Sequence, residues 1–192
     1  MQIGKYAVAL KKYIFSNDYR FLINAGRGKF NDMPDGEYIS RKYTATCGRE
    51  LSLDNPLTFN EKLQWLKIND RKPEYTVMVD KYRVRDYISE RIGNRYLIPL
   101  LGVWDDPDEI DFEALPDKFV LKCNHNSGLG MCICSNKALL NISNVKAQLR
   151  KGLNQDYYLS GREWPYKNVP RKIIAEQFMK SDVGGLTDYK VH

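Results

Sequence analysis

The apolar pattern of this chain changes near Gly93, and that change restricts the fold class more than any other feature. Before it, apolar side chains recur at helical spacing, which predicts helices over residues 2–30, 59–70 and 73–92. After it, short apolar runs predict strands, interrupted by one helix that Ser143 caps. These strands are expected over residues 96–104, 118–123, 131–134, 171–179 and 186–192. The order predicts an α+β fold whose strands form mainly antiparallel hairpins.

Local signals predict where the helices begin and end. Thr58 and Glu61 have the spacing of a capping box, so a helix is expected to begin directly after Thr58. Pro73 suits the first turn of the next helix, and Gly93 suits its end. The acidic, turn-rich stretch over residues 105–116 predicts a surface connection.

The composition is that of an ordinary folded chain of 192 residues, with 43 % hydrophobic and 28 % charged residues. The chain has 30 Lys and Arg against 24 Asp and Glu, so its net charge is +6. An excess of this size suits an anionic partner such as a nucleotide, a polyanionic glycan or a membrane surface. The basic residues are dispersed, so we expect no nucleic-acid binding. No apolar run reaches the roughly 20 residues of a membrane-spanning helix, and the first residues do not resemble a secretory signal.

Four cysteines occur, and none belongs to a C-x-x-C pair: Cys47, Cys123, Cys132 and Cys134. With only two histidines to assist them, we expect no metal site but reduced thiols that pack as small apolar groups. Cys132 and Cys134 are two residues apart, so they share one strand face, with Ile133 on the other.

Lys122 and the loop that follows it are a candidate anion site. The lysine ends a predicted strand directly before residues 124–130, whose small and polar side chains leave backbone N–H groups accessible to a phosphate. The glycines follow the lysine, so the order matches neither a P-loop nor a Rossmann fingerprint. A tight hairpin turn without a ligand is the alternative interpretation.

Lys81 and Glu176 are ionisable residues in apolar surroundings. On a helix over residues 73–92, Lys81 shares a stripe with three apolar side chains, so its ammonium needs an anion or must extend to solvent. Glu176 lies between two large apolar side chains on one face of its predicted strand. Such a carboxylate must be paired or meet a ligand, unless the strand is an exposed edge. Asp188 and Lys190 share a face of the last predicted strand, where a simple ion pair would explain them.

These residues occur within longer sequence motifs, called words below, which follow one another along the chain in a fixed order. The words are NPLTFNEKLQWL (55–66), DKYxVR (80–85), FVLKCNHxSG (119–128), REW (162–164), IAEQFM (174–179) and DYK (188–190). From about residue 54 to the end, the chain resembles the TupA-like ATP-grasp family, which is named for teichuronopeptide biosynthesis and associated with surface polysaccharides.

The resemblance implies a division of the chain and a nucleotide site. A basic helical region over residues 1–53 would precede a partial ATP-grasp-like domain over 54–192, with its phosphate-loop lobe at about 116–179 and its third lobe cut at 192. ATP would lie between two small antiparallel lobes, with the lysines and the loop on its phosphates and residues 176–179 as the hinge that contacts adenine. The implied binding residues are Lys81, Lys122, Ser127, Gly128, Gly130, Glu176, Gln177, Phe178 and Met179. Lys190 is the implied catalytic residue near the transferred phosphate.

The resemblance also implies the reaction and its partners. A carboxylate would be activated as an acyl phosphate and then joined to an amine, with a glycan precursor and an amino-acid-like molecule as substrates. The residues themselves predict a cytoplasmic protein, because no secretory signal is evident and the cysteines are expected to be reduced, with peripheral contact to the inner face of the membrane through the basic N-terminus. The Mg²⁺ ligands of the family lie beyond the hinge, and no acidic pair follows Lys190 before His192. The expectation is therefore a truncated and inactive chain that lacks these ligands.

Two other functions remain open from the sequence. A glycosyltransferase would need a metal motif such as Asp-x-Asp, and the nearest approach is Asp106-x-Asp108 in a loop broken by proline. A non-catalytic glycan- or membrane-associated protein would use the basic helices of the first thirty residues.

Overall fold

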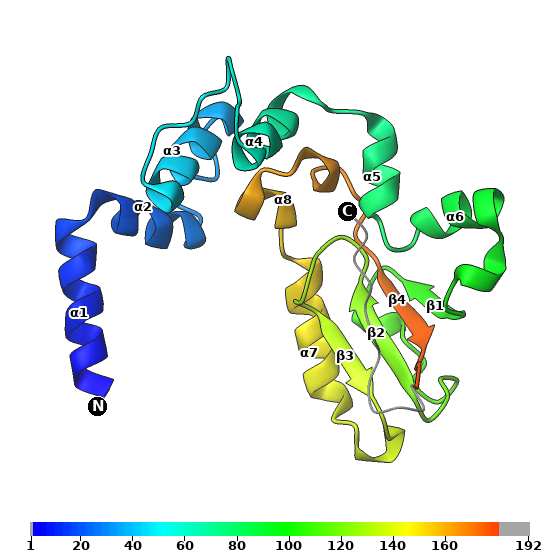
Figure 1. Ribbon diagram of the computed structural model, residues 1–192. Helices are drawn as coiled ribbons and strands as arrows, with labels where there is room; N and C mark the ends of the chain where they lie inside the picture. The colour runs from blue at the N-terminus through cyan, green and yellow to red at the C-terminus, as the bar shows by residue number, and fades with distance from the viewer. Residues whose placement is uncertain (1, 181–192) are drawn as a thin grey trace. The chain divides into compact units, whose positions relative to one another are not determined.

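The computed structural model describes residues 2–180, with side chains described from residue 8 onward (Figure 1). The chain forms two compact units. Unit 1 comprises the chain up to Pro73 together with Asp156–Lys167, and unit 2 comprises Glu74–Gln155 and the chain from Asn168 onward. The boundary at residue 54 that the resemblance implies separates a helical region from an ATP-grasp-like domain, and it stays a prediction.

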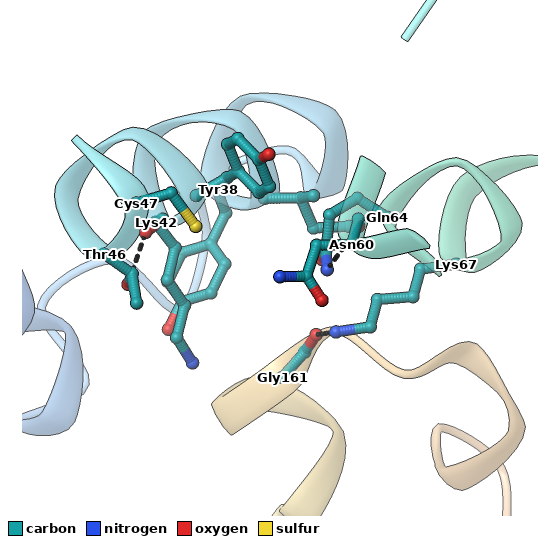
Figure 2. Close-up of a pocket in the computed structure, with 10 residues that line it drawn as sticks. Tyr38, Lys42, Thr46, Cys47, Asn60, Gln64, Lys67 and Gly161 are labelled. Atoms are coloured by element: carbon teal, nitrogen blue, oxygen red, sulfur yellow. Dashed lines mark hydrogen bonds between the residues drawn. The ribbon is translucent and has the colours of Figure 1, made fainter. Parts of the chain in front are cut away.

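Unit 1 is helical. Its elements are α1 (Gln2–Phe15), α2 (Asn17–Gly26), α3 (Asp35–Cys47), α4 (Phe59–Asn69), α8 (Tyr157–Gly161) and a 3₁₀ turn over Trp164–Tyr166. The spacing predicts α1, α2 and α4, whereas α3 and α8 were not predicted. Between α3, α4 and the end of α8 lies a cavity of about 250 Å³ (Figure 2). The core of the unit is largely aromatic, with Phe21, Tyr38, Tyr43 and Tyr158 at most 5 % exposed.

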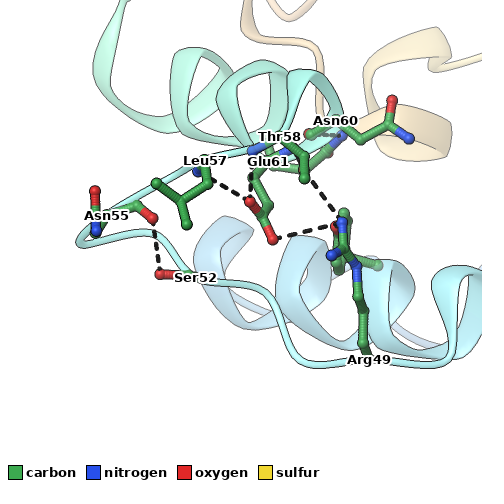
Figure 3. Close-up of polar contacts among 9 residues, drawn as sticks. Arg49, Ser52, Asn55, Leu57, Thr58, Asn60 and Glu61 are labelled. Atoms are coloured by element: carbon green, nitrogen blue, oxygen red, sulfur yellow. Dashed lines mark hydrogen bonds and ion pairs between the residues drawn. The ribbon is translucent and has the colours of Figure 1, made fainter.

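The predicted capping box at the start of α4 is confirmed (Figure 3). The Thr58 hydroxyl accepts a hydrogen bond from the Glu61 N–H, and the Glu61 carboxylate accepts from the N–H groups of Thr58 and Leu57. Arg49 lies 3.6 Å from the same carboxylate. These bonds lower the pKa of Glu61, the backbone bond from Thr58 above all. Glu61 is therefore occupied at the helix end.

The single helix predicted over residues 73–92 is wrong. The structure has α5 (Pro73–Val79) and α6 (Val84–Ile92), separated by a turn. Asp80 makes the turn, because its carboxylate accepts hydrogen bonds from the N–H groups of Tyr82 and Arg83. An aspartate that bonds to its own backbone in this way competes with helix formation.

Unit 2 contains a four-stranded antiparallel sheet, which confirms the α+β class. Its strands are β1 (Leu100–Trp104), β2 (Phe119–Cys123), β3 (Met131–Cys134) and β4 (Ile173–Gln177). Their order is β1-β4-β2-β3. Among the described residues only β2 and β3 form a hairpin, and the second predicted hairpin, over residues 171–192, lies partly outside them, so the expectation of mainly hairpins stays a prediction. The strand predicted over residues 96–104 begins only after Pro99, and the one predicted over 186–192 lies outside the described residues.

One face of this sheet carries the core. Phe119, Leu121 and Cys123 of β2 point to it and are at most 1 % exposed. Helix α7 (Ile142–Leu153) covers them with Val145 and Leu149, and its cap is Asn141 rather than the predicted Ser143. The predicted face sharing on β3 is confirmed, with Cys134 buried and Ile133 61 % exposed.

The connection between β1 and β2 is not simply the surface segment expected from its acidity. Its apolar residues Ile110, Phe112 and Leu115 are at most 6 % exposed and belong to the core. Turn residues let the backbone bend there while three side chains stay buried. The acidic, turn-rich composition of residues 105–116 gave no indication that three of their side chains belong to the core.

Candidate functional site

The face of the sheet opposite this core carries a buried ion pair. Val120 of β2 is paired with Glu176 of β4, which places Lys122 on the same face one step along. The Lys122 Nζ lies 2.5 Å from the Glu176 Oε2, and the two side chains are 25 % and 8 % exposed. The requirement that Glu176 be paired or meet a ligand is thus met within the protein.

Arg85 is the second partner of this carboxylate, and the sequence reasoning did not select it. Its guanidinium comes from the first turn of α6, lies 3.4 Å from the Glu176 Oε1 and donates to the Ile98 carbonyl at 2.5 Å. Only 14 % of the side chain is exposed. Two sequence features could have identified it: a buried Glu176 needs a cation as partner, and Arg85 is the last residue of the motif DKYxVR (80–85), which also contains Lys81.

Lys81 lies in the turn between α5 and α6 rather than on a helix stripe. Its ammonium donates to the carbonyls of Asn124, at 3.3 Å, and Asn126. Burial lowers the pKa of Lys81, and the nearby charge of Lys122 lowers it further. Lys81, Arg85 and Lys122 with Glu176 are called the cation cluster below; it holds three positive charges and one negative charge.

Asn124 fastens the start of the loop to this cluster. Its fully buried carboxamide donates to the Asp80 carboxylate and the Pro170 carbonyl, both at 2.8 Å. Its Oδ1 accepts from the Lys172 N–H at 2.7 Å. One side chain therefore ties the α5–α6 turn, the loop and the entry to β4, and this role was not predicted from the sequence.

The predicted loop after Lys122 is present and has two different parts. Asn124, His125 and Asn126 are at most 3 % exposed, whereas Ser127 and Gly128 are exposed at the tip. Gly128 has φ +81°, a left-handed conformation that glycine adopts without cost. The tip can therefore present backbone N–H groups while its base stays fixed.

Gly130 has a packing role in addition to the one predicted for it. Its φ is +69°, and a Cβ there would lie 2.7 Å from the Cys123 Sγ and 2.8 Å from the Gly152 Cα. Only glycine permits this approach of the loop to α7.

The predicted hinge, residues 176–179, comprises the last two residues of β4 and the two residues after it. Gln177 is exposed, and its N–H donates to the Pro99 carbonyl at 3.0 Å. Phe178 is half-buried and Met179 is 43 % exposed. Lys190, the predicted catalytic residue, lies outside the described residues.

A comparison with known protein families identifies the family of this chain. The model of the family TupA-like ATPgrasp matches residues 61–192, more than half of the chain. The chain belongs to the TupA-like ATPgrasp family. The match contains the whole cation cluster, the loop and the hinge of this ATP-grasp protein. A search of curated proteins and a search of solved structures gave no match.

ATP-grasp proteins bind ATP and Mg²⁺, and the described residues fit the two unequally. The cation cluster has the charge and the partly buried donors that a phosphate chain requires. Within residues 2–180, no group of three or more His, Cys, Asp or Glu is placed to hold a metal ion. The Asp80 carboxylate is used by the turn and by Asn124, and that of Glu176 by two cations. These residues do not form a Mg²⁺ site.

None of the helices in the described part of this family member has the length and apolar character needed to traverse a bilayer.

Proposed function

We propose that unit 2 binds the phosphates of ATP at the cation cluster, and that the protein acts in ATP-dependent ligation of a carboxylate to an amine in surface-polysaccharide modification. The observation that carries the proposal is that Lys81 and Lys122 lie at the base of the loop, while Arg85 contacts the same Glu176 carboxylate as Lys122. The family match supports an ATP-grasp-type protein. The ligase reaction and the glycan and amino-acid-like substrates are part of the proposal.

The charge balance supports an anionic ligand. Glu176 neutralises one of the three cations and the buried Asp80 carboxylate, which also acts on Lys81, neutralises a second, so an excess of one positive charge lies in a partly buried place. Phosphate oxygens offer several acceptors to such charges, and charge-assisted hydrogen bonds are the strong ones. The ligand would restore the charge balance that the protein leaves incomplete.

Each residue has a distinct part in this binding. The Lys122 ammonium has three donors, so it can contact a phosphate while its ion pair with Glu176 keeps the lysine side chain oriented. Arg85 is a positioning residue, because its guanidinium is already committed to Glu176 and the Ile98 carbonyl. Lys81 fixes the loop base and adds positive charge. The tip adds backbone N–H groups of the kind that surround phosphates elsewhere.

The adenine contact is expected at Phe178 and Met179 rather than at Gln177. The N–H of Gln177 donates to the Pro99 carbonyl, so the first backbone N–H available to a base edge comes after it. Phe178 and Met179 also carry the apolar side chains that suit a purine face. When bound, ATP would supply the phosphoryl group that activates the carboxylate.

The test is a calorimetric titration of the full chain with ATP and, separately, with ADP. Lys122→Met should weaken binding about 10- to 100-fold, since a hydrogen bond to a charged group contributes about 1.5–3 kcal/mol. Lys151→Met removes an exposed lysine of α7 and should leave the affinity unchanged. Binding should also weaken as salt rises. Equal affinities of the two variants would refute the phosphate site.

One observation favours a second activity, peripheral membrane contact. Val8, Leu10, Ile14 and Phe15 of α1 are each more than half exposed, next to Lys11 and Lys12. Apolar side chains beside lysines on a helix suit the surface of an anionic bilayer. Co-sedimentation with vesicles containing phosphatidylserine should fall for a Leu10→Ser, Phe15→Ser variant. Unchanged co-sedimentation would remove this proposal.

The glycosyltransferase alternative gains no support from its one motif. Asp106 and Asp108 both pair with Arg150, and Asp108 also lies 3.2 Å from the Lys146 ammonium. These contacts hold the turn after β1 against α7. The two carboxylates thus have a role in packing the fold.

A further inference from the structure

Unit 1 contains a cavity whose lining residues are all different from those of the cation cluster in unit 2. It measures about 250 Å³ and is lined by α3, α4 and the end of α8, all within the one unit (Figure 2). Figure 2 shows Lys67 extending from α4 to the carbonyl of Gly161. The lining combines two lysines with the buried side chains of Tyr38, Ile39 and Tyr43.

Both lysines of the cavity are partly withdrawn from water. Lys42 is half-buried and donates to the Ser160 carbonyl, and Lys67 is 22 % exposed and donates to the Gly161 carbonyl at 3.1 Å. Burial lowers the pKa of Lys42, and the nearby charge of Lys67 lowers it further. Burial also lowers the pKa of Lys67. The two ammonium groups thus share one partly desolvated space.

The charges in this space do not balance. Glu163 lies 3.9 Å from the Lys67 Nζ, and 46 % of its side chain is exposed. Within the described part of the chain, Lys42 has no carboxylate within the 4.0 Å of an ion pair. Two cations and one carboxylate leave one positive charge. A single negative charge is what the cavity lacks.

We propose that this cavity binds a small organic carboxylate, with its carboxylate group between Lys42 and Lys67 and its apolar body against Tyr38, Ile39 and Tyr43. A carboxylate supplies the one missing charge, whereas a phosphate monoester dianion exceeds it. The cavity is smaller than the roughly 300–1,000 Å³ of drug-sized sites, so the ligand is about the size of benzoate. The proposal rests on unit 1 alone and does not depend on nucleotide binding by unit 2.

A purely structural explanation of the lysines makes a different prediction. Ser160 and Gly161 belong to the last turn of α8, whose carbonyls lack helix partners, and lysines commonly satisfy such groups. On that explanation the lysines affect stability only. Each ammonium has three donors, so capping one carbonyl leaves capacity for a ligand.

Cys47 gives a direct readout, because it lines the cavity and is exposed, whereas Cys123 and Cys134 are buried. The full chain is treated with N-ethylmaleimide in the presence of benzoate or of its neutral analogue benzamide, and alkylation of Cys47 is followed by mass spectrometry. Benzoate should slow the reaction several-fold, and benzamide should not. Saturation-transfer NMR on benzoate provides a second readout that does not involve the thiol.

Variants then separate ligand binding from capping. Lys42→Gln and Lys67→Gln keep a donor but lose the charge, and each should raise the half-protecting concentration of benzoate at least tenfold. Lys62→Gln, at an exposed position of the same helix α4, should not change it, and Lys42→Arg should retain most of the protection. Equal protection by benzoate and benzamide would overturn the proposal, as would full protection of both glutamine variants. Stronger protection by phenyl phosphate than by benzoate would overturn the assignment to a carboxylate.

Discussion

Lys122 and Glu176 meet across two neighbouring antiparallel strands, with the ammonium 2.5 Å from the carboxylate. The same carboxylate lies 3.4 Å from Arg85, so helix α6 and strand β2 both contribute a cation to one glutamate of β4. A buried carboxylate that fixes two cations prepares them for a ligand of opposite charge. It also makes that part of the fold dependent on Glu176, which leads to the first prediction.

Glu176→Gln should destabilise the protein by about 3 kcal/mol, because removing the carboxylate leaves Arg85 and Lys122 as partly buried cations without their common partner. The measurement is urea unfolding followed by circular dichroism. Asp105→Asn is the control: its carboxylate lies 2.6 Å from Lys172 but is 71 % exposed, so its loss should cost at most about 1 kcal/mol. If both substitutions cost the same, Glu176 is not the organising residue of the cluster.

Gly130→Ala should destabilise unit 2 by roughly 2–4 kcal/mol. The left-handed backbone costs an L residue roughly 1–2 kcal/mol, and the added Cβ would overlap the Cys123 sulfur and Gly152. Gly128→Ala, at φ +81° with open space around it, should lose only about 1 kcal/mol. Thermal unfolding of the two variants provides the comparison. A Gly128 variant that is as unstable as the Gly130 variant would contradict the packing role.

Local signals were sufficient for much of this fold. The capping box of α4, strand β2 and the loop that follows it depend on neighbouring residues, and the sequence predicted all three. It also predicted that Glu176 needs a partner, since an apolar strand face implies burial. It placed Lys81, Lys122 and Glu176 in one site through the resemblance, and the structure brings these three together.

The errors came from contacts between residues far apart in the chain. The turn at Asp80 interrupts an apolar periodicity that continues on both sides, and it is held by Asn124, 44 residues away. The central place of β4 depends on pairing with both β1 and β2, which no local pattern encodes. Arg85 was missed, although it ends the word DKYxVR, because its burial depends on contacts with Glu176 and the Ile98 carbonyl, which lie far along the chain.

Arg162→Lys should destabilise unit 1 by about 2–4 kcal/mol. The Arg162 side chain, 4 % exposed, donates to the carbonyls of Phe30 and Asn31, both at 2.8 Å, and its guanidinium lies 4.6 Å from the Tyr38 ring centroid. Lysine keeps the charge but loses the planar fork that serves both carbonyls.

The control for this substitution is Arg91→Lys, an exposed arginine of α6 that stacks on Tyr87. Its cost should stay below about 1 kcal/mol. Chemical unfolding followed by tyrosine and tryptophan fluorescence measures both variants. An Arg162→Lys protein as stable as the parent would show that this packing does not depend on the guanidinium.

The last prediction concerns the proton balance at Lys81. Burial and the charge of Lys122 lower its pKa below 10.5, so the folded protein releases this proton at a lower pH than the unfolded chain. Between the lowered pKa and 10.5 the unfolded state binds more protons, and the Lys81 contribution to the free energy of unfolding therefore rises with pH. An anion bound at the cluster stabilises the charged form and raises this pKa again.

Binding of ATP at a pH between the lowered pKa of Lys81 and 10.5 should thus be accompanied by proton uptake. Calorimetric titrations in two buffers of different ionisation enthalpy measure the number of protons taken up. The uptake should disappear in Lys81→Met and persist in Lys151→Met, whose substituted side chain is exposed on α7. Uptake that is unchanged in Lys81→Met would assign the proton to another group and would separate Lys81 from the phosphate site, whether or not ATP binds.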